Sequence, residues 1–489
     1  MKGSVKGSVA ACVALVVATA ASAKDLLGVY HDAVLYDAQI RQADATRKAA
    51  REANPQAWAE LLPQISGSYA FTREKIEQSA VEAFPGPGGA VLPAQFATSE
   101  YASNHGYQLQ LQQSLFNWAY WAGVSKAKKQ VGQAEADYRA AQENLIQRTA
   151  QAYFNVLSAQ DTLDAQAASL EAISRQLDQA NKRFEVGLIA ITDVKEAQAA
   201  RDSAAAAVID AKRQLASQQQ VLREITNLDY PSLSKPGENM PLEVPQPADP
   251  DRWVQASMDQ NLSLVSSRLG ADVARENVQI AFAGHLPTLS FTASTEQQDQ
   301  AITESLTVRQ PGFPAVVTPV FPAPGSLKQS QIGVQLSVPI FSGGLVSSQK
   351  RQAQYQWIAA KENVVVVSRQ TEHQARDAYS GVLSEVARVN ALKQGVISAE
   401  VALKATEAGY EVGTRTAVEV LQQRQSLVQA QTNYAQAKYA YLMDIITLRL
   451  AAGTLDEQTL KDIDQWLTVN QPTNTSPVTA PTPAVTPQP

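Results

Sequence analysis

The chain has 489 residues, with 47 acidic side chains, 41 lysines and arginines, and a formal net charge of −6. Because phosphate binding requires a basic surface, this diffuse acidic balance argues against nucleic acid as a partner. Beyond residue 23, no segment has the uncharged apolar run of about 20 residues that a membrane helix needs. A membrane protein of this composition would therefore have to cross lipid as a β-barrel.

Residues 1–23 are predicted to be a secretory signal peptide. Lys2 and Lys6 form a basic start, an apolar stretch follows, and Ala21-Ser22-Ala23 supplies the small residues of a cleavage site. The only cysteine, Cys12, lies in this segment, so cleavage after Ala23 would remove it. The mature chain would then contain no disulfide and no thiolate metal site, and loss of the two lysines would change its formal charge from −6 to −8.

An internal duplication organises the rest of the chain. Residues 183–188 (RFEVGL) match residues 409–414 (GYEVGT) at an offset of 226, and other landmarks recur in the same order at nearly the same spacing. A period this long indicates a duplicated domain rather than a solenoid. The predicted divisions are a first repeat over 24–228, a linker over 229–250, a second repeat over 251–455, an equatorial segment over 456–470 and a disordered Pro/Thr-rich tail over 471–489.

Each half begins with a predicted helix, such as Asp32–Trp58, and continues with a pair of strands bounded by proline. Apolar and polar side chains alternate in four segments, which are Ile65–Phe71, Tyr107–Leu115, Leu289–Ala293 and Gln331–Phe341. One face is lipophilic and the other is rich in glutamine and serine, as a transmembrane barrel strand requires. The pattern alone is equally typical of a soluble two-layer sheet with one solvent-exposed face.

The segments between the strands favour the barrel. Phe84–Gly89 and Pro311–Pro324 are predicted to be long loops of the kind found on the extracellular side of such barrels. Four strands per chain are fewer than the roughly eight of the smallest closed membrane barrels, and an open edge cannot exist in lipid. Several chains would therefore share one barrel, and three chains would supply twelve strands.

Two very long helices are predicted over Tyr120–Glu185 and Val346–Glu411. Both segments lack proline and are dense in alanine, glutamine, glutamate, lysine and leucine, which are good helix formers. Their apolar stripes are narrow, so the helices must pack side by side as coiled coils do. Gly187 and Gly413 follow these helices and are predicted to adopt the left-handed conformation that ends them. An elongated dimeric coiled coil would explain these helices but not the strand pairs.

An enzyme is not indicated. The four histidines are scattered without ligand spacing, and there is no nucleophile motif or phosphate loop. We therefore expect no catalytic residue, no metal site and no cofactor. The histidines are His31, His105, His285 and His373.

Several motifs, in order along the chain, resemble those of the TolC family of outer-membrane channels. The segments that carry the resemblance are Phe184–Val194, Gly284–Leu289, Gly409–Thr416 and Ala451–Leu455. The resemblance implies a mixed α and β membrane protein built from two structural repeats. It would be a homotrimer in which a 12-stranded β-barrel, with four strands per protomer, is continued by a 12-helix α-barrel whose helix tips close the periplasmic mouth. The linker and the C-terminal segment would build an equatorial layer.

The resemblance also implies functional residues. Asp193, Tyr410 and Arg415 match residues that hold the inner helix pair closed through a salt bridge and hydrogen bonds. Glu419 and Gln422 match two acidic positions, one helical turn apart, that ring the pore constriction and bind cations. Because one position is neutral here, cation selectivity and multivalent block should be weaker. The turn tips that would meet the periplasmic adaptor are Gly187, Leu188, Gly413 and Thr414.

The expected function is a passive exit duct in the outer membrane that extends into the periplasm. It would serve type I protein secretion, multidrug efflux or both, together with a periplasmic adaptor and an inner-membrane transporter of the ABC or RND type. A secreted coiled-coil structural or adaptor protein that does not conduct is the alternative. The amphipathic strands discriminate between the two, since an adaptor needs no lipid-facing alternation.

Overall fold

The computed structural model describes residues 23–85, 87–89, 91–237, 240–320 and 324–468. The predicted tail over 471–489 and all but the last residue of the predicted signal peptide lie outside the described residues. The chain forms two compact units, each of which combines segments from both halves of the sequence. One unit holds Lys48–Ala134 and Ser267–Val364, and the other holds the remainder.

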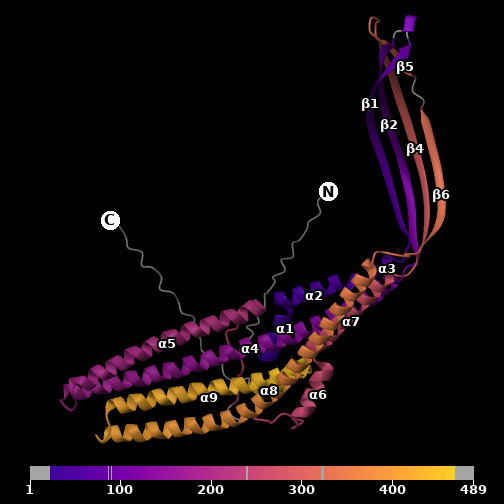
Figure 1. Ribbon diagram of the computed structural model, residues 1–489. Helices are drawn as coiled ribbons and strands as arrows, with labels where there is room; N and C mark the ends of the chain where they lie inside the picture. Colours follow the sequence, from indigo (N-terminus) through magenta and orange to yellow (C-terminus); the bar gives the residue numbers. More distant parts are fainter. Residues whose placement is uncertain (1–22, 86, 90, 238–239, 321–323, 469–489) are drawn as a thin grey trace, which may run out of the picture. The chain divides into compact units, whose positions relative to one another are not determined.

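An antiparallel sheet dominates the unit that contains Lys48–Ala134 (Figure 1). Strand β1 pairs with β2, β2 with β4, and β4 with both β5 and β6. Among the described residues, β1 and β6 each have one neighbour, so both are edge strands. The strands are β1 (Gln64–Pro85), β2 (Val91–Phe116), β4 (Thr288–Arg309), β5 (Val316–Val320) and β6 (Gly325–Ser337).

The strands are longer than the sequence pattern predicted, and both predicted loops are wrong in extent. The ladder between β1 and β2 runs without a register shift from Gln64 opposite Gln112 to Pro85 opposite Val91. Phe84 and Pro85 therefore belong to a strand, and within Pro311–Pro324 the strand β5 pairs with β4. Backbone pairing does not require an alternating side-chain pattern, so it continues where the alternation stops.

The predicted helix over Asp32–Trp58 is three helices, α1 (Leu26–Tyr36), α2 (Ala38–Arg51) and α3 (Ala53–Ala59). The first break is at Asp37, which is extended rather than helical. Its buried carboxylate accepts a hydrogen bond from the Ile40 amide at 2.8 Å, as an N-cap does, and forms a two-point contact with Arg148 at 3.1 and 3.2 Å. Local capping therefore outweighed the helix propensity of the segment.

The long helices agree with the prediction to within two residues at each end. They are α4 (Trp118–Glu185) and α8 (Leu345–Glu411), and α5 (Ile191–Thr226) and α9 (Ala417–Ala451) return from their turns. None of the helices in the described ranges combines the length and apolar composition that crossing a bilayer requires. The remaining helices are η1 (Pro87–Gly89), α6 (Pro250–Gln260), α7 (Leu262–Ala283) and α10 (Glu457–Asp464).

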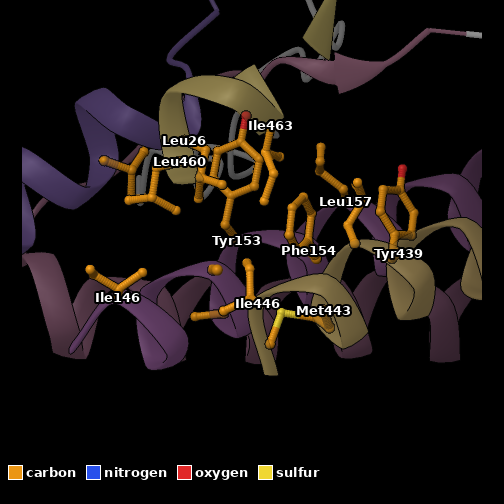
Figure 2. Packing of buried hydrophobic residues seen from close by; sticks show 14 of the residues in the cluster. Leu26, Ile146, Tyr153, Phe154, Leu157, Tyr439, Met443, Ile446, Leu460 and Ile463 are labelled. Atoms are coloured by element: carbon orange, nitrogen blue, oxygen red, sulfur yellow. The ribbon is translucent and has the colours of Figure 1, made fainter. Parts of the chain in front are cut away.

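A single large apolar cluster holds the other unit together. Tyr153 and Phe154 of α4 are fully buried in it, and Phe154 stacks on Tyr439 of α9 with ring centroids 6.0 Å apart (Figure 2). Full burial of each such side chain stabilises the fold by roughly 1.5–3 kcal/mol. Helix α10 joins this cluster, and its Asp464 accepts hydrogen bonds from the amides of Leu26 and Leu27 at 3.0 and 2.9 Å.

The segment after α5 and the C-terminal segment lie against each other in this unit. The short strands β3 (Lys235–Pro236) and β7 (Leu467–Thr468) pair antiparallel. The Tyr153 hydroxyl donates a hydrogen bond to the Ser234 carbonyl at 2.7 Å, which ties the same segment to α4. Two stretches more than two hundred residues apart in sequence therefore cover one part of the helix bundle.

Candidate functional site at the helix turns

Both long hairpins turn at a glycine in the left-handed conformation, as predicted. Gly187 has φ +78° and Gly413 has φ +79°, values that other residues adopt only with strain. The amides of Leu188 and Thr414 each donate to the carbonyl five residues earlier, at 2.9 and 2.8 Å. This bond completes a Schellman motif in each turn and satisfies carbonyls that the ending helix leaves unpaired.

The two returning helices begin differently. In α9, the Thr416 hydroxyl accepts a hydrogen bond from the Glu419 amide, and the Glu419 carboxylate accepts one from the Thr416 amide, both at 3.3 Å. This reciprocal pair is a capping box. Helix α5 begins at Ile191, and its N-cap residue Ala190 has no side chain capable of capping, so its first amides lack this support.

Arg415 is paired within its own turn. Its Nη1 lies 2.7 Å from Oε2 of Glu419. Hydrogen bonds from Arg415 and from the backbone and hydroxyl of Thr416 lower the pKa of Glu419 below its usual range. Asp193 lies half-buried in the first turn of α5. Among the described residues, the structure thus joins Arg415 to Glu419 rather than to Asp193.

Tyr410 contacts the first hairpin through a residue that the sequence analysis missed. The guanidinium carbon of Arg183, near the end of α4, lies 5.2 Å from the centre of the Tyr410 ring, within the range of a cation–π contact. Arg183 opens the repeated segment 183–188, and Gly409 occupies its place in the second copy. That departure from the repeat was the available signal.

Glu419 and Gln422, the two predicted constriction residues, lie one turn apart on α9. They are three residues apart and therefore lie on the same side of the helix. The Glu419 carboxylate is held by Arg415 and Thr416. Gln422 is exposed. A second ion pair, between Arg424 and Glu407, joins α9 to α8 just beyond this point.

Apolar side chains stand exposed at both tips. Val186 and Val412, which directly precede the turn glycines, are 70% and 76% exposed, and Leu188 is 73% exposed. Leu188 was predicted from the sequence and the two valines were not, although each repeat contains the same Glu-Val-Gly triplet. Exposed apolar residues grouped in this way mark interaction surfaces more often than scattered ones do.

Comparison with known proteins places the chain in a family. A family model described as outer membrane efflux protein matches residues 29–228 and 253–454, which is more than half of the chain. The chain belongs to this family. It is 36% identical over 458 residues to the outer membrane protein TolC of Escherichia coli, an alignment that covers 93% of this chain and 87% of that protein. It is 28% identical over 446 residues to the alkaline protease secretion protein AprF of Pseudomonas aeruginosa, covering 90% and 87%.

Solved structures of outer-membrane channels share the fold. The Campylobacter jejuni CmeC channel superimposes with a TM-score of 0.68 at 19% identity, covering 90% of this chain and 89% of that one. The Neisseria gonorrhoeae MtrE channel, solved in an open state, gives 0.64 at 16% identity, covering 89% and 91%.

As a member of the TolC family, the protein is an outer-membrane channel for efflux or secretion, and its relatives are channel proteins rather than enzymes. The described part of the chain contains no group of three or more histidine, cysteine, aspartate or glutamate side chains placed to hold a metal ion. The residues that the sequence predicts for gating and docking lie at the two helix turns and in the first turns of α5 and α9.

Proposed function

We propose that three copies of the chain form one passive exit duct. The observation that carries this proposal is the open sheet, whose edge strands β1 and β6 present unpaired backbone groups. In lipid such groups cost several kcal/mol each, so the edges must pair with other copies. Since β5 and β6 pair with successive parts of β4, they count as one strand of the barrel. Three sheets joined edge to edge then give twelve strands, and the hairpins α4–α5 and α8–α9 continue the barrel as a tunnel of twelve helices.

The two faces of the sheet support this arrangement. Ile65, Leu111, Ala293 and Ile332 are opposite one another across the four strands and therefore lie on one face. Their sequence neighbours Gln64, Gln112, Thr292 and Gly333 form the matching row on the other face. A lipid-facing apolar surface and a polar lumen are the division that a membrane barrel requires.

At the periplasmic mouth, Arg415 can serve as a two-position latch. In the closed trimer it would bind Asp193, and Tyr410 would hold the same helix pair through Asp193 and Arg183. On opening, Arg415 would return to Glu419, the partner that it has in the single chain. Because Glu419 satisfies the freed guanidinium, release of the gate does not leave an unpaired charge. Individually weak surface links, repeated by symmetry, suit a gate that a partner must be able to open.

Docking would occur at the turn tips. The exposed Val186, Leu188 and Val412, beside Gly187 and Gly413, offer an apolar surface to a periplasmic adaptor that is joined to an inner-membrane transporter of the ABC or RND type. The relative named for alkaline protease secretion supports a polypeptide cargo, and the description of the family as efflux proteins supports efflux. Glu419 and Gln422 would line the narrowest part of the closed mouth.

Conductance tests the proposal directly. Protein extracted from the outer membrane in detergent should run as a trimer and should conduct in planar lipid bilayers. Crosslinking in cells, followed by purification, should recover an adaptor and a transporter with it. A water-soluble monomer or dimer without conductance would instead support the non-conducting coiled-coil adaptor.

A further inference from the structure

The strands are much longer than a bilayer requires. Strands β1 and β4 have 22 residues each and β2 has 26. At about 3.3 Å per residue, 22 residues extend over roughly 70 Å, whereas a tilted transmembrane strand needs only about 9–11 residues. About half of each strand, at the end remote from α3 and α4, is therefore not needed to cross lipid.

The half of the sheet next to the helices has the polarity of a membrane wall. On the face that carries Ile65, the side chains are mostly apolar from the row of Leu289 and Leu336 up to the row of Tyr69 and Tyr107. Those two tyrosines are directly opposite each other and exposed. Exposed aromatic residues at the limit of an apolar band are typical of the membrane–water interface.

Beyond the tyrosines this face becomes polar. The next row carries Phe71 opposite His105. The rows after it carry Arg73, Lys75 and Glu77, opposite Ser103, Tyr101 and Ser99 respectively. Lys75 and Glu77 form an ion pair at 2.5 Å, and both side chains remain largely exposed. Charged residues on a lipid-facing surface destabilise a barrel, so this part of the face belongs in water.

The opposite face becomes more apolar in the remote half. Near the helices it is rich in glutamine and serine, but in the remote half it carries Ile76, Phe96, Ile302, Leu306 and Val308. The rings of Phe84 and Phe96 are 5.6 Å apart on this face. Residues of β2 on this face are more covered than their neighbours, since Ala94 and Ala102 are only 3% and 5% exposed. Four glutamates also lie on this face: Glu74 and Glu82 of β1, and Glu100 and Glu304, which are opposite each other.

We propose that residues 72–85, 91–105 and 299–309 form an extracellular turret, in which the duct wall continues beyond the lipid with a different polarity on each face. The face with Arg73, Lys75 and Glu77 meets water outside. The more covered face, with its apolar residues such as Phe96 and Ile302, turns inward and narrows the exit. This inference rests on the proposed trimer, in which the remote half of β1 pairs with β5 and β6 of the next copy. With a strand tilt of about 40°, the fourteen residues of β1 in this part would rise roughly 35 Å above the membrane.

Two positions on one strand test the turret. Ala293 and Thr303 lie on the same face of β4, ten residues apart, the first within the apolar band and the second beyond it. Ala293→Cys and Thr303→Cys are each made with Cys12→Ser, which removes the only native cysteine. In intact cells a membrane-impermeant maleimide should label Thr303→Cys and should leave Ala293→Cys unlabelled until the protein is denatured. Labelling of Thr303→Cys only after denaturation would overturn the turret.

Charge insertion provides an independent measurement at the same positions. Ala293→Asp should sharply reduce the yield of trimer, whereas Thr303→Asp should leave it unchanged. Equal losses would contradict the turret. Single-channel conductance separates this failure from that of the duct: a conducting trimer with an inaccessible residue 303 refutes only the turret, and a protein that does not conduct refutes the duct itself.

Substitution of Ile302, which directly precedes Thr303, tests whether the turret narrows the exit. Ile302 lies on the inward face next to Thr303 on the outward face. Ile302→Ser should raise single-channel conductance in a variant whose periplasmic gate is already open, and the matched control Thr303→Ser should not. Equal conductance in the two variants would refute a narrowing of the exit by apolar side chains on the inward face.

Discussion

The two helix turns have the same backbone and different side-chain chemistry. Gly187 and Gly413 have nearly identical φ values and end their helices with the same pair of hydrogen bonds. After the second glycine, Arg415, Thr416 and Glu419 form a local polar network, whereas Ala190, the N-cap residue of α5, provides no side-chain cap. The duplicated backbone thus makes two tips, and only the second has a local network of polar side chains at the start of its returning helix.

The largest effect on conductance is expected from a substitution of Arg415, which belongs to the polar network of the second turn. Arg415→Ser deletes the link that would close the mouth, so single-channel conductance should rise several-fold. Glu419→Gln removes the competing partner of Arg415 and should lower the open probability. Its effect should disappear when Asp193→Asn is also present, because the two carboxylates compete for the same guanidinium. Conductance unchanged by Arg415→Ser would show that the polar network of the second turn is not part of the gate.

The next prediction tests whether Glu419 and Gln422 line the pore constriction. Gln422→Asp would give each protomer a second carboxylate one turn from Glu419. Block of the channel by a trivalent cation such as hexamminecobalt should strengthen by about tenfold, if the added charges contribute roughly 1.4 kcal/mol to binding. Gln425→Asp, also exposed and further along α9, is the control. If Gln422→Asp leaves block unchanged, residues 419 and 422 do not line the constriction.

The helix starts can be exchanged between the turns. Thr416→Ala removes the capping box and should destabilise the first turn of α9 by about 1 kcal/mol, whereas Ala190→Thr should add a cap and stabilise α5 by a similar or smaller amount. Hydrogen exchange of the amides in each first turn measures both. Opposite shifts support the difference seen between the turns, and shifts of the same sign would contradict it.

The last prediction compares the pKa values of two glutamates, Glu419 at the second turn and Glu143 in the helix bundle. Burial raises the pKa of Glu143 on α4 to about 7, whereas the pKa of Glu419 is lowered. Because folded Glu143 holds its proton more tightly than the unfolded chain, stability should fall as pH rises from about 4.5 to about 7. Allowing for solvent screening of this half-exposed group, Glu143→Gln should be more stable than wild type by about 1 kcal/mol at pH 8 and nearly equal at pH 4.5.

Unfolding by denaturant at the two pH values measures this difference for Glu143→Gln. Glu171→Gln, which removes an exposed carboxylate from the same helix, is the matched control. A stabilisation that is the same at both pH values would mean that ionisation of Glu143 is not its cause.

Local features of the sequence predicted much of this protein. Proline-free runs of good helix formers located α4 and α8, and the glycines after them located the turns, because helix propensity and left-handed φ are properties of neighbouring residues. Alternating side chains located the parts of the strands that are nearest to the helices in sequence. The family motifs named Asp193, Tyr410, Arg415, Glu419 and Gln422 as candidates for the gate and the constriction.

Contacts between distant residues were decided only in the tertiary structure. Asp37 divides the first helix through its own capping bond and its contact with Arg148 on α4. Arg183 meets Tyr410 across more than two hundred residues of sequence. The strands continue past Phe71 through backbone pairing, although the alternation of apolar and polar side chains is weak there. The change in polarity of each face therefore becomes visible only in the register. Local propensity is set by adjacent residues, whereas partner choice depends on which elements the folded chain brings together.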